Sequence, residues 1–223
     1  MSWWLFNRKK ANQKSFVKEY LEKAKKSIPN IRSFDQLSFV VLDTETTGLN
    51  PAEDHILSFG AVKIQGEKIQ IASSVEWYLN STKKGKEAII IHGLMGNEKK
   101  VSLENFSIQL LEYLGNNILV GHHLGFDLEM LQKALRPVGL ERFPNPCIDT
   151  AQLAIRIDHG LMVDRNRINF KEYTLDFLCQ RFKIKTHDRH TAGGDAFLTA
   201  SLFLKLLKLA SKKGIDNWGL LNK

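Results

Sequence analysis

The chain has 223 residues, enough to bury one sizeable core, and we expect one domain with a short appendage. Its apolar and charged fractions, 43% and 25%, are ordinary for a globular protein. No apolar run reaches the roughly 18 residues of a membrane helix, and WWLF at the N-terminus is too short for a signal peptide. We therefore expect a cytoplasmic protein without integral membrane association. The net charge of +8 points to a polyanionic partner.

The first 34 residues differ in character from the rest. Apolar residues recur at helical spacing between Asn12 and Ser27, and Pro29 follows, which predicts a lysine-rich amphipathic helix with Asn12 as its N-cap. We expect residues 1–34 to form a basic helical extension folded back on the domain. The alternative is that the two tryptophans near the start, beside basic residues, mark a membrane surface or a partner site.

Residues 39–49, FVVLDTETTGL, predict a buried strand that ends in two carboxylates. Its first four residues are bulky and apolar without interruption, as in a strand buried on both faces. Because strand side chains alternate, Asp43 and Glu45 point to one face and Thr44 to the other. Repulsion between the two acids must be relieved by protonation or by a cation, and Mg²⁺ prefers carboxylate oxygen. Two solvated acids at a strand end are the alternative interpretation of this stretch alone.

A turn and a hairpin follow this strand. Gly48 and Asn50 tolerate the left-handed conformations that a tight turn demands, and a ligand could approach the backbone closely there. Residues 55–64 and 68–79 predict two strands joined by a turn at Gly66. Three antiparallel strands are therefore expected.

The second half of the sequence predicts strands and helices in alternation. Such an order after a hairpin is typical of an α/β domain with a mixed sheet. We place the body of the domain at residues 35–213 and a C-terminal tail at residues 214–223. The predicted elements are a helix starting near Ser102, a strand at 118–120, a helix at 126–135, a helix capped by Asp149, a basic irregular segment at 156–172, and helices at 174–182 and 195–210.

Two further acids and a histidine occur near predicted helix starts. Asp127 begins a helix directly after a short strand, and Asp195 follows Gly193 and Gly194 at the start of the last long helix. His190 lies five positions before Asp195, so a flexible loop could bring its imidazole to the same place. Acids in a first helical turn are also favoured by the helix dipole, so the combination carries more weight than any one of them.

The segments DTETTGL, HHLGFD and HTAGGD, in this order, resemble the three motifs of the DnaQ-like 3′-5′ exonucleases, the histidine subclass of the DEDD superfamily. The likeness runs from about Ser38 to Leu207. It implies an α/β, ribonuclease-H-like exonuclease fold, with a mixed central sheet flanked by helices, and removal of nucleoside monophosphates from DNA 3′ ends. It also implies two divalent metal ions, Mg²⁺ or Mn²⁺, as cofactors. The roles it implies are metal ligation by Asp43, Glu45, Asp127 and Asp195, and general base catalysis by His190.

The chemistry of phosphodiester hydrolysis agrees with these roles. The substrate is negative and water is a poor nucleophile, and two cations about 3.5 to 4 Å apart answer both difficulties. Carboxylates supply the hard oxygen ligands that such cations need. A histidine, with an ordinary pKa near 6.5, can accept the proton of water around neutral pH.

The resemblance extends to substrate contacts. In the branch that contains the epsilon subunits of DNA polymerase III, a glutamate and a histidine in an E-x4-HG pattern approach the terminal nucleotide, and Glu87 and His92 match them. Apolar Leu49 suits stacking against any base, so we expect binding that is independent of sequence. His123 departs from the family, which usually has asparagine there. The turn that resembles the base-contacting segment comprises Thr46, Thr47, Gly48 and Leu49.

The implied partners are DNA 3′ ends, single-stranded or frayed, and a DNA polymerase is a further candidate partner. Proofreading or repair is the expected setting. The active site is shared across the superfamily and does not decide the sugar, so an RNA exonuclease is the enzymatic alternative. An inactive nucleic-acid-binding module is the alternative from another class.

Overall fold

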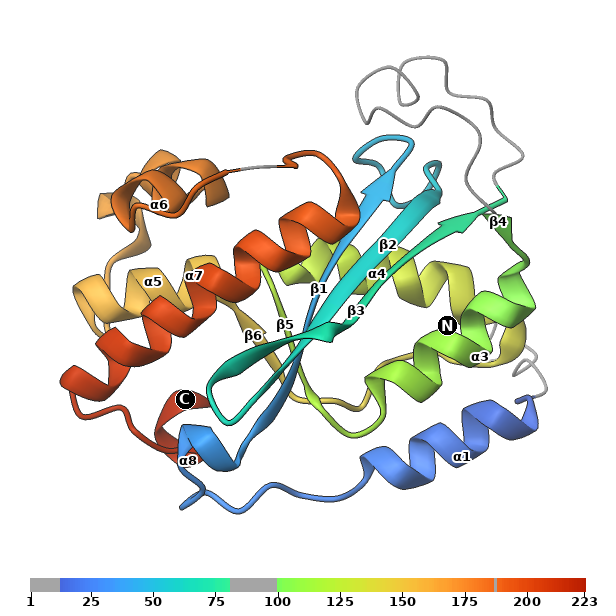
Figure 1. Cartoon of the computed structure of the whole chain (residues 1–223), viewed down its shortest axis with the longest axis horizontal. Coiled ribbons are helices and arrows are strands. Elements are labelled where there is room, and N and C mark those ends of the chain that lie inside the picture. The colour runs from blue at the N-terminus through green and yellow to red at the C-terminus, as the bar shows by residue number, and fades with distance from the viewer. Residues whose placement is uncertain (1–12, 81–99, 187) are drawn as a thin grey trace, which may run out of the picture.

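A mixed six-stranded sheet in the order β4-β3-β2-β1-β5-β6 lies between helices on both of its faces (Figure 1). The computed structural model describes residues 13–80, 100–186 and 188–223. The strands are β1 (Ser38–Thr46), β2 (Ile56–Gln65), β3 (Lys68–Leu79), β4 (Lys100–Val101), β5 (Ile118–Gly121) and β6 (Cys147–Asp149). The helices are α1 (Ser15–Ala24), α3 (Leu103–Leu114), α4 (Leu124–Leu135), α5 (Thr150–His159), α6 (Leu175–Arg181), α7 (Ala192–Lys212) and α8 (Trp218–Leu221).

Strands β1, β2 and β3 form the predicted antiparallel set. The turn between β2 and β3 consists of Gly66 and Glu67, with φ values of 55° and 57°. Positive φ at both central residues is what a two-residue turn needs to match the twist of the flanking strands. The prediction of a hairpin around Gly66 is confirmed. The pairing of β2 with β1 then decides which residues of β2 lie beside the acids of β1.

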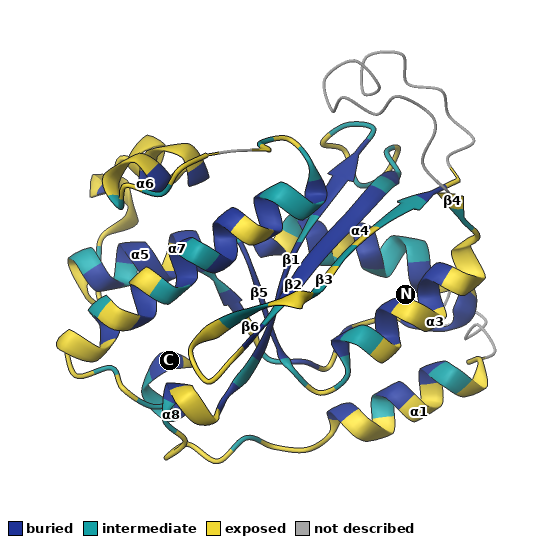
Figure 2. Ribbon diagram, in the orientation of Figure 1, coloured by how far each residue is buried: buried dark blue, intermediate teal, exposed yellow. Residues whose placement is uncertain are grey.

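Strand β1 is buried on both faces, as its uninterrupted apolar run predicts (Figure 2). Phe39 and Val41 belong to a core on the face covered by α5 and α7, where the ring of Phe39 meets that of Phe203 edge-on at 5.0 Å. Val40 and Leu42 belong to a second core on the face covered by α3 and α4. Packing on both faces therefore fixes the strand up to the positions of Asp43 and Glu45.

Strands β5 and β6 run parallel to β1, so their carboxyl ends meet at one edge of the sheet. Asp149 ends β6 there, and its Oδ1 accepts from the backbone N–H groups of Ala151 and Gln152 at 2.9 and 3.2 Å, which confirms it as the N-cap of α5. Its Oδ2 accepts from the N–H of Leu124 at 2.9 Å. One carboxylate thus positions the starts of two helices at the edge where functional groups of such sheets gather.

Several boundaries differ from the sequence predictions. Helix α7 begins at Ala192, one turn before the predicted start at Asp195, because Thr191 caps it by accepting from the N–H of Gly194 at 3.0 Å. Gly193 and Gly194 therefore belong to the first helical turn and not to a flexible loop. Helix α1 begins at Ser15 with Lys14 before it, and the predicted N-cap Asn12 lies outside the described residues. Short strands β4 and β6 were not predicted.

Both outer segments pack against the sheet layers. In α1, Val17 and Tyr20 are buried in the core on the α3 and α4 face, and the Tyr20 hydroxyl donates to Oδ1 of Asn145. Residues 214–223, expected as a tail, contain α8, whose Trp218 and Leu221 are buried in the other core. None of the helices in the described ranges combines the length and the apolar character needed to cross a bilayer.

Candidate metal centre

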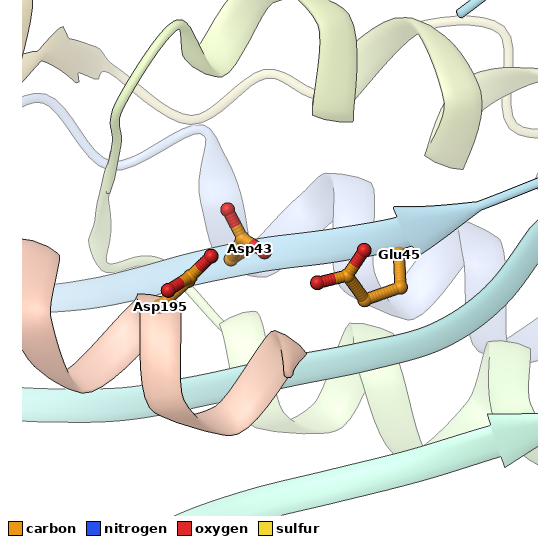
Figure 3. A group of neighbouring side chains, drawn as sticks. All are labelled: Asp43, Glu45 and Asp195. Carbon is orange, nitrogen blue, oxygen red and sulfur yellow. The ribbon is translucent and has the colours of Figure 1, made fainter. Parts of the chain in front are cut away.

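Three carboxylates meet at the carboxyl end of β1 (Figure 3). Asp43 and Glu45 come from β1 and Asp195 from the first turn of α7, and one oxygen of each lies within 4.8 Å of the others. Glu45 and Asp195 are only 8% and 7% exposed. Placing three acids so close together costs free energy unless protons or a cation compensate, so the group is able to hold a cation.

The start of α7 reaches β1 because β2 carries a glycine at the crossing point. Gly60 pairs with Asp43 across the sheet, and a Cβ atom added to Gly60 would lie 2.1 Å from the carbonyl carbon of Ala192. No side chain fits there, as is typical of a strand glycine where another backbone approaches closely. Gly60 therefore allows Asp195 to come within reach of Asp43.

Asp127 approaches the same place from the other face of the sheet. Its Oδ1 accepts from the N–H of Thr44 at 2.9 Å and from the Thr44 hydroxyl at 2.7 Å. This confirms that Thr44 points away from Asp43 and Glu45. Asp127 is 5% exposed, and after burial its charge is the largest cause that raises the pKa of Asp43. Asp127 is thus a neighbour of Asp43 but lies outside the group of three, with one oxygen committed to Thr44.

Burial and mutual repulsion raise the pKa values of these acids. The pKa of Asp43 lies well above its ordinary range, first because it is buried and then because of Asp127 and Asp195. Burial, with the Asp195 charge, raises the pKa of Glu45 to about 7, and burial raises that of Asp127 to about 7. Near neutral pH, Glu45 and Asp127 exchange protons readily for a cation. Hard divalent ions prefer such oxygen ligands, so the residues fit the metal that the motifs imply.

Arg189, which the sequence analysis did not single out, also contacts this group. Its Nη1 forms an ion pair with Oδ1 of Asp195, while its Nε and Nη2 donate to the two oxygens of Asp176 on α6 at 2.7 and 3.1 Å. A second missed residue is Glu76 on β3, whose Oε1 accepts from the N–H of Gly193 at 3.2 Å and so holds the first turn of α7. A basic residue directly before His190 was the available signal for Arg189.

His190 lies at the rim of the site. Its side chain is exposed and its φ is 65°. Burial and the Asp195 charge raise the pKa of Glu45, and a charge on His190 opposes that shift, which places the imidazole near Glu45. His122 is different: its Nδ1 lies 2.9 Å from the Thr150 hydroxyl, and burial lowers its pKa to about 3. His123 is exposed at the start of α4 with a φ of 60°.

The turn after β1 is organised by Asp54. Oδ1 of Asp54 accepts from the Thr47 hydroxyl at 2.8 Å, and Oδ2 accepts from the N–H of Asn50 at 2.9 Å. Gly48 and Asn50 tolerate left-handed conformations, but this turn does not use that tolerance, since neither residue has a positive φ. Gly48 serves a different need: a Cβ atom there would lie 2.6 Å from Oδ2 of Asp54. Leu49 projects from this turn with 85% of its surface exposed.

The predicted substrate residues divide into two groups. Thr46 is buried at the end of β1, and its hydroxyl donates to the carbonyl of Gly48 at 2.7 Å, so it belongs to the same turn beside the carboxylates. Glu87 and His92 lie outside the described residues.

The sheet is ribonuclease-H-like and carries carboxylates at the carboxyl end of its central strand β1. This is the arrangement that the exonuclease motifs imply. A family model described as exonuclease matches residues 40–203. The chain therefore belongs to this exonuclease family.

Curated relatives of the chain include PolC-type DNA polymerase III and the epsilon subunit of DNA polymerase III. A PolC-type DNA polymerase III from Thermotoga petrophila is 34% identical over 190 residues, which cover 82% of this chain and 13% of the relative. The DNA polymerase III subunit epsilon from Aquifex aeolicus is 29% identical over 186 residues, which cover 81% of this chain and 86% of the relative. The chain thus spans about an eighth of the PolC-type relatives and most of the epsilon subunit.

Solved structures share the fold at low sequence identity. E. coli Exonuclease I in complex with a dT13 oligonucleotide superposes with a TM-score of 0.62 and 18% identity, covering 80% of this chain and 43% of that one. Cell-death related nuclease 4 gives a TM-score of 0.61 and 14% identity, covering 79% of this chain and 65% of that one. These likenesses agree with the mixed sheet and its flanking helices.

Proposed function

We propose that this protein is a metal-dependent 3′-5′ exonuclease that hydrolyses DNA from its 3′ end and releases nucleoside monophosphates, in proofreading or in repair. The observation that carries the proposal is the group of three acids, Asp43, Glu45 and Asp195, with oxygens within 4.8 Å of one another. Residues 35–213 would form the exonuclease domain. Membership of the exonuclease family and the epsilon subunit among its relatives support the direction and class of the reaction.

The acids would hold two divalent ions, Mg²⁺ or Mn²⁺, with Asp127 as the fourth ligand. When bound, such ions polarise the phosphodiester and the attacking water and stabilise the leaving oxygen. Asp127 would use the oxygen that Thr44 does not occupy. His190 would take the proton of the attacking water, and its exposed side chain at the rim is open to substrate.

The 3′-terminal nucleotide would lie on the turn after β1. Leu49 offers an apolar surface that stacks on any base, and Thr46, Thr47 and Gly48 offer backbone contacts. Glu87 and His92 complete the proposed set. Single-stranded or frayed DNA ends suit the net charge of +8, and the dT13 complex of Exonuclease I supports a single strand as substrate. The replication relatives make a DNA polymerase the proposed partner and the cytoplasm the proposed location.

The decisive experiment replaces Asp43 by alanine and measures release of nucleoside monophosphates from labelled single-stranded DNA with Mg²⁺ or Mn²⁺. We expect cleavage to be lost, because a metal ligand is removed, while the protein stays folded because one buried like charge disappears from the group. Glu112→Ala, at an exposed acid on α3, is the matched control and should leave the rate unchanged. An Asp43→Ala protein that still cleaves DNA would overturn the mechanism.

The same assay with RNA oligomers of matched sequence tests the substrate class. We expect faster release from DNA, and faster release from mismatched than from matched duplex ends, because the terminal nucleotide must leave its partner to reach the turn at Leu49. A strong preference for RNA would replace the DNA assignment by an RNA exonuclease.

A further inference from the structure

Arg189 and His190 are neighbours in sequence but point in different directions. Arg189 lies between two non-glycine residues in left-handed conformations, Asp188 with φ 55° and His190 with φ 65°. This backbone turns the Arg189 side chain inward, where it is 19% exposed, and leaves His190 exposed. The loop before α7 therefore delivers a guanidinium to the carboxylates and keeps the imidazole at the rim.

Arg189 contacts two acids, Asp176 and Asp195, and the geometry of the two contacts differs. On Asp176, Nε and Nη2 meet both carboxylate oxygens at 2.7 and 3.1 Å, which is the two-point geometry that makes arginine pairs strong. On Asp195, only Nη1 makes an ion pair, and it contacts the single oxygen Oδ1. The Asp195 contact is thus a charge contact that a better ligand can replace.

Asp176 is outside the group of three and differs from its members. It lies on α6 and its side chain is 67% exposed. An arginine that loses Asp195 would therefore remain attached to α6 through both oxygens of Asp176. Its positive charge acts on the whole group, because it opposes the burial that raises the pKa values of Asp43 and Glu45.

We infer that Arg189 is the counter-cation of the metal-free site, and that a divalent ion binds by displacing it from Asp195 while Asp176 retains it. The inference rests on the proposed function, since it concerns the same metal ligands. Close carboxylates need protons or positive charge, and one guanidinium supplies part of that charge until a divalent ion, which prefers carboxylate oxygen, binds. Arg189 is then a positioning residue that competes with metal and keeps the acids in place.

The alternative role is a purely structural clamp between α6 and α7. The two roles predict opposite signs for metal affinity. A clamp holds Asp195 in the geometry that metal needs, so its removal weakens binding or leaves it unchanged. A competing cation lowers the affinity of the site, so its removal strengthens binding.

The test is calorimetric titration of the metal-free full chain with Mn²⁺. For Arg189→Gln we expect binding to tighten by about 5- to 150-fold, the usual range for coupling between two competing contacts, and the melting temperature of the metal-free protein to fall. Arg181→Gln is the control for the loss of a two-point arginine contact. Arg181 donates to both oxygens of Asp158 at 2.6 and 2.8 Å, and neither residue belongs to the group of three acids. Unchanged or weaker Mn²⁺ binding in Arg189→Gln would overturn the inference.

Lys185→Gln is the control for charge alone, because Lys185 is exposed and lines a hollow with Glu76 and Gly193 beside the start of α7. Equal tightening in Lys185→Gln would also overturn the inference, since it would show a general effect of charge.

Asp176→Asn provides an independent test if Arg189→Gln does not fold. It leaves Asp195 as the remaining acid paired with Arg189, so we expect Mn²⁺ binding to weaken by roughly 5-fold or more. Unchanged or tighter binding would contradict the displacement. Failure of the proposed function looks different: the unmodified chain would then neither bind Mn²⁺ nor release nucleoside monophosphates. A chain that does both, while Arg189→Gln binds no tighter, refutes only the role of Arg189.

Discussion

At the scale of single residues, Glu45 shows how burial prepares an acid for metal. Burial and the neighbouring Asp195 raise its pKa from 4.5 to about 7. A raised folded-state pKa means that protonated Glu45 favours the folded state. This contribution is fully present below pH 4.5 and is lost as pH rises through 7. A difference of this size corresponds to about 3 kcal/mol in the free energy of unfolding.

Glu45→Gln should therefore remove a pH dependence of stability. Below pH 4.5 the metal-free variant and the unmodified protein should unfold at similar denaturant concentrations, and by pH 8 the variant should be more stable by about 3 kcal/mol. Urea unfolding with a chelator present, between pH 4 and 8, measures this. Glu112→Gln should show no such divergence. Parallel curves for Glu45→Gln and the unmodified protein would contradict the burial argument, and excess divalent ion should abolish the advantage of the variant.

His190→Ala separates proton transfer from metal binding. We expect the rate of nucleotide release to fall by roughly 10²- to 10⁴-fold, the usual contribution of a general base, because the attacking water loses its proton acceptor. Affinity for Mn²⁺ should persist, since His190 is exposed and outside the three-carboxylate group. Single-turnover cleavage and a metal titration of the same preparation give both quantities. Loss of metal affinity would make His190 a ligand and not a base.

At the scale of elements, the crossing of α7 over β2 decides where Asp195 lies. The space at Gly60 is filled by the backbone of Ala192, and Glu76 on the next strand holds the N–H of Gly193. The sheet register thus fixes the first turn of α7 from two strands. The positions of Asp43 and Glu45 are fixed as well, because β1 is buried on both faces.

Gly60→Ala should separate α7 from the sheet. The added Cβ would lie 2.1 Å from Ala192, so the helix start must move, at a cost of about 1–3 kcal/mol or more. We expect a lower melting temperature and a loss of cleavage larger than the loss of stability explains, because Asp195 leaves Asp43. Gly125→Ala is the control, since a Cβ atom there meets nothing within 4 Å. Full activity in Gly60→Ala would show that the crossing does not set the site.

The elements that the sequence predicts are those fixed by local chemistry. The hairpin follows from apolar runs around Gly66, the helix start near Ser102 and the cap at Asp149 from local sequence signals, and the shared face of Asp43 and Glu45 from strand alternation. Contacts between distant segments leave no such pattern.

The attachment of Asp127 to Thr44 and of Arg189 to Asp195 appears only when the sheet has brought α4 and α7 to one edge. Strand β6 was missed because three residues are too short to show a period. The start of α7 was missed because two glycines suggest a loop, whereas here they leave space for the neighbouring backbone and Glu76.

At the scale of the whole molecule, α1 is packed as part of the domain and not as a loose appendage. Figure 1 shows it at the end of the sheet opposite the carboxyl end of β1. Tyr20 is 3% exposed, its ring meets Phe143 edge-on at 6.4 Å, and its hydroxyl donates to Asn145. Asn145 in turn donates to the carbonyls of Gly115 and Asn117 at 3.0 and 2.8 Å. One side chain of α1 thus joins the loop before β5 to the loop before β6.

Tyr20→Ala tests this unity. Removing a buried aromatic ring costs about 3–5 kcal/mol, which for a chain of this size lowers the melting temperature by roughly 10 °C. If α1 and the sheet form one cooperative unit, a single transition should shift as a whole, and cleavage measured well below it should keep its normal rate because the carboxylates are at the other end of β1. Lys18→Ala, exposed on the same helix, should change neither. Two separate transitions, with the main one unmoved, would show that α1 folds independently of the catalytic sheet.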